Sequence, residues 1–145
     1  MRAGRKPLLL SLLILWGLCG WTAAPAQVLV VVANPDTPAL NEDILQKIYL
    51  GKVIEVSGRP VIPVNLAKGD VSRKAFMEQV MGQDDEKFVA YWTVRRYIGK
   101  GSPPREFGTA KEQLEYVRAT PGAIGYLRNG VEIKQGLKLL LMKKP

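Results

Sequence analysis

The segment from Gln27 to Ala33 reads QVLVVVA, an apolar run in which β-branched residues follow one another without polar interruption. A strand with one solvated face alternates apolar and polar side chains, whereas this run predicts a strand that is covered on both faces. Such a strand needs other elements packed on both sides of its sheet. The run therefore favours a layered α/β domain.

The rest of the chain supplies helices between further strands. Strands are expected at 53–55, 61–65, 123–127 and 137–142, with a turn at 57–60 between the first two. The glycines and prolines of residues 99–105 exclude a helix there. Helices are expected to begin at capping residues, namely Asn41, Asp70, Asp84 or Asp85, and Thr109. We therefore predict a single α/β domain with a small mixed sheet flanked by helices.

Two of these helices carry apolar stripes at helical spacing. Phe76, Met77 and Val80 are expected to face the core from the helix that Asp70 begins and Gly82 ends. In the next helix, the aromatic side chains of residues 88, 91 and 92 have the same spacing. We interpret them as core residues and not as a ligand-binding box.

Residues 1–26 have the pattern of a secretory signal peptide. Basic residues precede an apolar run over 8–18, and small residues end the segment at Ala26. The run is shorter than the roughly 20 residues of a membrane span, so we expect cleavage near Ala26, with retention as an uncleaved anchor as the alternative. The remaining residues 27–145 suffice for one domain, which we expect to be periplasmic.

The residue types exclude several kinds of chemistry. The chain contains no histidine, and its one cysteine, Cys19, lies in the leader. The commonest general base, the commonest zinc ligands and any thiol nucleophile are therefore missing from residues 27–145. We expect no catalytic residues, no metal and no cofactor, and hence a non-catalytic protein.

The charge balance points to anionic partners. Three of the 21 basic residues lie in the leader, so residues 27–145 carry 18 Lys and Arg against 13 Asp and Glu. A moderate positive excess favours acidic partners or anionic surfaces. No run of like charges is long enough for a nucleic-acid tail, so no nucleic-acid partner is expected. The leader is the only segment expected to enter a membrane.

Three segments resemble one known family. In chain order they read VLVVVAN at 28–34, IYLGK at 48–52 and TPGAIGYL at 120–127. Together and in this order, they are similar to segments of the phosphate-binding proteins that serve ABC transporters. The resemblance implies a periplasmic-binding-protein-like fold and a link to anion uptake or sensing. Those relatives have two lobes that close on phosphate, whereas residues 27–145 suffice for one, which resembles the second lobe alone.

The chain departs from that family where the resemblance places the phosphate. The family has an arginine and then a hydroxyl-rich run after the strand that corresponds to 61–65, but here Leu66 replaces the arginine and DVSR at 70–73 replaces the run. A capping Asp70 would occupy the helix amides that bind anions. Two like charges about 4 Å apart repel by roughly 4 kcal/mol at an effective dielectric near 20, whereas a hydrogen bond to a charged group contributes about 1.5–3 kcal/mol. Tight phosphate binding is therefore not expected.

Two groups of residues remain as candidate sites. The turn after the strand at 61–65 could still bind a small inorganic anion, although a plain helix cap explains it as well. Its candidate ligand-binding residues are Asn65, Lys68, Gly69, Ser72 and Arg73. The second candidate is a basic cluster that could receive an anionic ligand, a phospholipid surface or an acidic partner, or could be a solvated helix end. Its residues are Arg95, Arg96, Lys100 and Arg105.

Two hypotheses about function follow. The first is a periplasmic, non-catalytic binding protein built as one lobe, related to an anion or to a transporter component. The second is an adaptor that docks on an envelope complex through the basic cluster. A hydrolase is disfavoured by the missing histidine and cysteine. The sequence leaves the ligand, the partner and the oligomeric state open.

Overall fold

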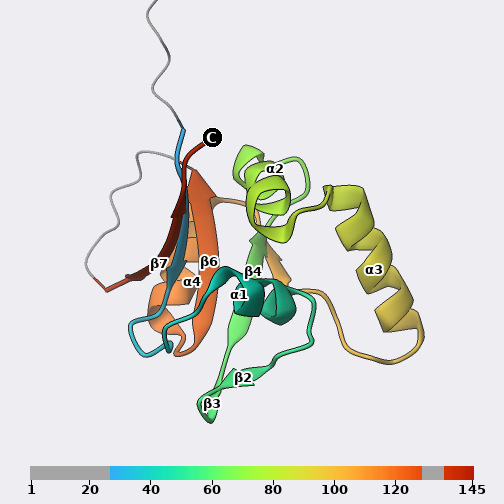
Figure 1. Cartoon of the computed structure of the whole chain (residues 1–145), viewed down its shortest axis with the longest axis horizontal. Coiled ribbons are helices and arrows are strands. Elements are labelled where there is room, and N and C mark those ends of the chain that lie inside the picture. Colours follow the sequence, from blue (N-terminus) through green and yellow to red (C-terminus); the bar gives the residue numbers. More distant parts are fainter. Residues whose placement is uncertain (1–26, 129–135) are drawn as a thin grey trace, which may run out of the picture.

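A five-stranded mixed sheet forms the centre of the computed structural model, which describes residues 27–128 and 136–145. Its strands are β1 (Leu29–Ala33), β4 (Ile62–Leu66), β5 (Arg105–Phe107), β6 (Ala123–Arg128) and β7 (Lys138–Lys143). They lie in the order β5-β4-β6-β1-β7 (Figure 1). β4 is parallel to β5 and β6, whereas β1 is antiparallel to β6 and β7. The predicted α/β class with a small mixed sheet flanked by helices is confirmed.

β1 is buried on both faces, as its sequence predicts. Val31 belongs to the larger core cluster, together with residues of α1 (Glu42–Tyr49) and α2 (Val71–Phe76). Val32 points to the opposite face and packs with Leu114 of α4 (Ala110–Ala119). Figure 1 shows α4 on one side of the sheet and α1 and α2 on the other. The layers therefore follow from the absence of polar residues in this strand.

The predicted helix caps are present. Asn41 Oδ1 accepts a hydrogen bond from the Ile44 amide at 2.9 Å and begins α1. Thr109 and Glu112 form the expected capping box of α4. The helix α3 (Asp85–Tyr97) begins after Asp84, so the sequence alternative of Asp84 or Asp85 is resolved in favour of Asp84. Each of these caps pairs an amide that the first helical turn leaves without an intrahelical acceptor.

The segment after Asp70 bends in a way that the sequence does not predict. α2 has regular geometry only to Phe76 and continues as the π-helical turn η1 (Met77–Met81), which Gly82 ends with a φ of 65°. The predicted core residues of this segment, Phe76, Met77 and Val80, are nevertheless buried. The Val80 carbonyl accepts a hydrogen bond from Gln46 Nε2 at 2.6 Å, which ties η1 to α1.

Two sequence predictions need correction. Residues 57–60 do not form one turn, because Ser57 and Gly58 have positive φ angles of 52° and 71° and close a tight two-residue hairpin. Its strands are β2 (Glu55–Val56) and β3 (Arg59–Pro60). The predicted 99–105 loop also ends earlier, because Arg105 begins β5, a strand too short to produce a periodic pattern.

The predicted signal peptide at 1–26 lies outside the described residues. Within residues 27–128 and 136–145, no helix combines the length and the apolar character that a membrane span requires.

Candidate functional site

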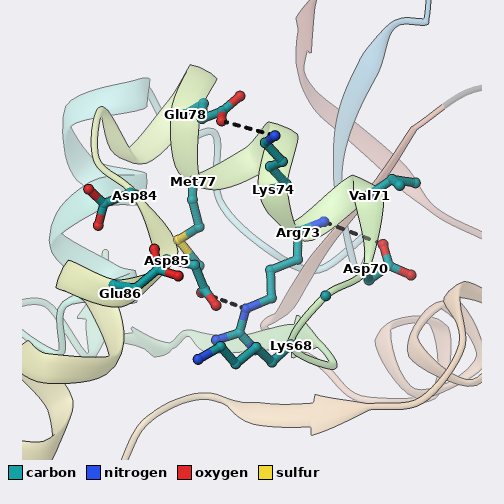
Figure 2. A pocket seen from close by; sticks show the side chains of 11 residues that line it. Lys68, Asp70, Val71, Arg73, Lys74, Met77, Glu78, Asp84, Asp85 and Glu86 are labelled. Atoms are coloured by element: carbon teal, nitrogen blue, oxygen red, sulfur yellow. Dashed lines mark hydrogen bonds and ion pairs between the residues drawn. The ribbon is translucent and has the colours of Figure 1, made fainter.

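A cavity of about 440 Å³ lies beside α2 and contains part of the predicted ligand-binding turn. Figure 2 shows the acidic residues at the start of α3 on one side of it and Lys68 and Arg73 on the other. Both walls follow from helix starts, because Asp70 begins α2 and Asp84 begins α3. The lining residues are Lys68, Gly69, Asp70, Val71, Arg73, Lys74, Met77, Glu78, Asp84, Asp85 and Glu86.

Asp70 occupies the amides at the start of α2. Its Oδ1 accepts hydrogen bonds from the amides of Ser72 at 2.7 Å and Arg73 at 3.4 Å. The predicted helix cap is therefore confirmed. The carboxylate lies where an incoming anion would otherwise find these donors.

The Arg73 side chain is buried, with 2% of its surface exposed, and its Nε and Nη1 are hydrogen-bonded within the protein. Its Nε donates to Asp85 Oδ1 at 2.7 Å, and its Nη1 donates to the Leu66 carbonyl at 2.8 Å and to Glu106. Burial alone lowers the pKa of the guanidinium, but the hydrogen bonds with Glu106 and Asp85 outweigh burial and raise it. Arg73 thus joins α2, α3, β4 and β5 as a permanently charged link.

Two of the predicted ligand-binding residues lie apart from the cavity. Ser72 is buried, and its Oγ accepts a hydrogen bond from the Arg128 amide at 3.0 Å. Asn65 is 1% exposed, and its Oδ1 accepts a hydrogen bond from the Tyr126 hydroxyl. The structure therefore brings Lys68, Gly69 and Arg73 together at the cavity and uses Asn65 and Ser72 in contacts with β6.

The cavity lining carries more negative than positive charge. Three cations, Lys68, Arg73 and Lys74, face five carboxylates, Asp70, Glu78, Asp84, Asp85 and Glu86. Of the five acidic residues, only Asp70 was predicted at this site. Residues 84–86 belong to an element whose packing beside α2 has no local signal, whereas Glu78 lies one turn after Lys74 in the continuation of α2 and could have been found from helical spacing. Among the described residues, no cluster of three or more His, Cys, Asp or Glu side chains is arranged to hold a metal ion.

The predicted basic cluster divides into two kinds of residue. Arg95 lies over the rings of Tyr91 and Trp92, 5.5 Å from each centroid. Arg105 lies over Phe107 at 4.9 Å and over Tyr116 at 5.4 Å. Arg96 and Lys100 are exposed at the end of α3. Arg105 is exposed as well, so three of the four cations are exposed and Arg95 is half-buried.

The expected core aromatics of α3 are inside, but the helix also exposes apolar side chains. Phe88 and Trp92 are 1% and 5% exposed, so their interpretation as core residues is confirmed. Val94, Tyr97 and Ile98 are exposed by 60%, 91% and 54%. The core prediction covered only residues 88, 91 and 92, of which Tyr91 is half-buried, and no role was predicted for Val94, Tyr97 and Ile98 as a patch.

Comparison with solved structures identifies the fold. The chain is similar to an ABC-type phosphate transport receptor from Vibrio cholerae, with 17% identity and a TM-score of 0.59 over 79% of this chain and 46% of that protein. It is equally similar to a phosphate ABC transporter substrate-binding protein with bound phosphate from Clostridium perfringens, with 18% identity, a TM-score of 0.59 and coverage of 79% and 45%. PstS from Borrelia burgdorferi is 18% identical, with a TM-score of 0.58 over 79% of this chain and 47% of that protein.

These neighbours confirm the predicted resemblance at the level of fold. The chain spans less than half the length of each of them. No protein-family model matches the sequence, and no curated protein matches it significantly.

Proposed function

We propose that this chain is an exported, non-catalytic binding protein that acts through contacts on its surface and does not hold a phosphate ion in the α2 cavity. The observation that carries the proposal is the buried Arg73 guanidinium, which is already paired with Asp85 and Glu106. The structural neighbours are phosphate transport receptors and substrate-binding proteins, and one of them contains bound phosphate. This chain shares their fold over less than half of their length, and the helix amides and the guanidinium that could contact an anion in the α2 cavity already have protein acceptors.

The energies of exchanging partners oppose phosphate binding. Removing a charged group from a buried ion pair costs about 3–5 kcal/mol, and each hydrogen bond that phosphate could offer to Arg73 returns about 1.5–3 kcal/mol. The exchange is close to neutral before the repulsion from the surplus carboxylates of the cavity is counted. Exposed Lys68 adds one more donor, which is screened by solvent.

Titration calorimetry on purified residues 27–145 tests this proposal directly. We expect no saturable heat with inorganic phosphate or with sulfate into the millimolar range. The variant Lys68→Gln is titrated in parallel with the unmodified protein, because it removes a cation of the cavity without changing a buried contact. Sub-micromolar phosphate binding would contradict the proposal, and so would weaker binding that Lys68→Gln abolishes.

Export is the second part of the proposal. The basic start, the apolar run and the small residues of positions 1–26 support cleavage near Ala26 and release into the periplasm. Intact mass measurement of protein recovered from the periplasm is expected to give a chain that begins at Gln27. Recovery of the uncleaved chain from the membrane fraction would instead favour the anchor.

The exposed part of the basic cluster favours a second candidate function, an adaptor that docks on an envelope partner. Arg96 and Lys100 are exposed and, unlike Arg95 and Arg105, do not lie over an aromatic ring, so a partner can bind them without breaking a cation–π contact. We expect Arg96→Glu with Lys100→Glu to abolish capture of such a partner without lowering the melting temperature. Unchanged capture would count against this function.

A further inference from the structure

The last turn of α3 and the residue positions after it present apolar and basic side chains together. We call this set the α3 tip, and it consists of Val94, Arg96, Tyr97, Ile98 and Lys100. Its apolar members are more than half exposed, and Tyr97 has 91% of its surface in solvent. Positions 94, 97 and 98 are three and four residues apart, so their side chains adjoin on the helix surface.

The helix that carries the tip is fixed by contacts of Tyr91 and Trp92, which lie one to two turns before it. Trp92 Nε1 donates to the Tyr49 carbonyl at 3.2 Å, and the Tyr91 hydroxyl donates to the Leu50 carbonyl at 2.7 Å. Both contacts join α3 to the end of α1. Figure 1 shows α3 at the outer side of the molecule, away from β1 and β7. The tip is therefore a preformed surface at the periphery of the fold.

The segment that contains the tip has no acidic residue, although Glu106 and Arg96 line the same small pocket. From residue 87 to residue 105 the chain contains no Asp or Glu, and its basic residues there are Lys87, Arg95, Arg96, Lys100 and Arg105. The carboxylates of α3 lie at its opposite end, where Asp84, Asp85 and Glu86 line the cavity. Lys87 lies at this acidic end, 3.6 Å from Asp84 Oδ2, whereas Arg95, Arg96 and Lys100 lie at the exposed end of the helix.

We infer that the α3 tip docks on an anionic phospholipid surface. Exposed aliphatic and tyrosine side chains surrounded by cations fit the interfacial layer of such a membrane, where apolar groups enter the headgroup region and cations meet lipid phosphates. The amphipathic tyrosine ring suits this boundary as well. The inference deepens the proposed function, on which it rests only for the export that places the tip beside an envelope membrane.

Vesicle sedimentation with residues 27–145 tests the inference. We expect binding to vesicles that contain phosphatidylglycerol at low salt, and little binding to vesicles of phosphatidylcholine alone. Because each cation near an anionic surface increases partitioning about fivefold, Arg96→Glu with Lys100→Glu should weaken binding at least tenfold. Tyr97→Ser with Ile98→Ser should weaken the part of the binding that persists at high salt.

A matched control separates the tip from overall charge. Lys111→Glu with Lys144→Glu changes the net charge equally but alters exposed residues on α4 and near the chain end. This control is expected to keep most of the binding to phosphatidylglycerol vesicles. Melting temperatures of all variants show that each remains folded.

Three outcomes would overturn the inference. They are no binding to phosphatidylglycerol vesicles, equal binding by the tip and control variants, and loss of binding only through unfolding. The first outcome would instead favour an acidic protein as the partner that binds the α3 tip. The phosphate titration does not depend on the tip, so the proposed absence of phosphate binding stands or falls separately.

Discussion

Replacing Arg73 with methionine tests whether this residue is a structural link and not a ligand-binding group. Arg73→Met keeps a long side chain but leaves Asp85 without its cation and the buried Leu66 carbonyl without its donor. Each lost hydrogen bond to a charged group accounts for about 1.5–3 kcal/mol. The Glu106 side chain is 49% exposed and regains water, so its loss is smaller. We expect the free energy of unfolding to fall by about 3–5 kcal/mol, as for other buried pairs that lose one partner.

Urea unfolding followed by the fluorescence of Trp92, the single tryptophan of residues 27–145, measures this loss. The melting temperature should fall by roughly 10–20 °C for a domain of this size. Lys74→Met is the control, because Lys74 lines the same cavity with a side chain that is 77% exposed, and it should change stability by no more than about 0.5 kcal/mol. Adding Asp85→Asn to Arg73→Met should recover part of the loss, since the unpaired charge disappears. A loss below about 1 kcal/mol in Arg73→Met would refute the structural role.

Two further predictions concern stability. Gly51 and Gly82 both have a φ of 65°, but a Cβ at Gly51 would lie 2.7 Å from Trp92 Cη2, whereas a Cβ at Gly82 would meet nothing within 4 Å. Gly82→Ala should therefore lower the free energy of unfolding by about 1–2 kcal/mol, through backbone strain alone. Gly51→Ala should lower it by about 1–3 kcal/mol more, because the added methyl group also meets Trp92. Equal melting temperatures of the two variants would contradict this reasoning. Burial raises the pKa of Tyr49 and of Tyr126, so the stability that both contribute is complete below about pH 10 and is lost as the pH rises further. The free energy of unfolding, measured with urea between about pH 8 and about pH 11, should stay constant and then fall by up to about 1.4 kcal/mol per pH unit for each tyrosine. A free energy that remains constant above about pH 10 would exclude this coupling.

Local patterns were sufficient to predict the elements and their caps. Asn41, Asp70 and Thr109 each accept a hydrogen bond from an amide two or three residues ahead, and such contacts are encoded within one turn of sequence. The strand that contains Val31 and Val32 was predictable for a related reason, because burial on both faces excludes polar residues from it.

The partners of Arg73 could not be predicted in the same way. Asp85 is 12 residues away and Glu106 is 33 residues away, so no local pattern connects them to Arg73. From the sequence, Asp85 was an alternative helix cap and Glu106 had no assigned role. Only the arrangement of α2, α3 and β5 around the cavity shows that two carboxylates meet one guanidinium there.

The segments that resemble the phosphate-binding family have structural roles in this chain. In the segment 48–52, the Tyr49 hydroxyl lies 2.9 Å from the Val64 carbonyl oxygen, and Gly51 leaves room for Trp92. In the segment 120–127, a Cβ at Gly122 would lie 2.1 Å from the Pro60 carbonyl oxygen. These residues bring strands and helices together and do not touch the cavity. The resemblance therefore predicts the fold well and carries little information about the ligand.

The contacts of Arg73 connect the α2 cavity with the segment that carries the α3 tip. Asp85 is the first residue of α3, and Glu106 lies in β5 just beyond the basic loop. By binding both carboxylates, Arg73 fixes the two ends of the segment 85–106, which contains the α3 tip. An arginine engaged in this way is unavailable to a solute, and the segment that it holds is the one with the exposed apolar and basic residues. One of the structural neighbours contains bound phosphate, whereas the recognition that we propose for this chain uses the surface of the same fold.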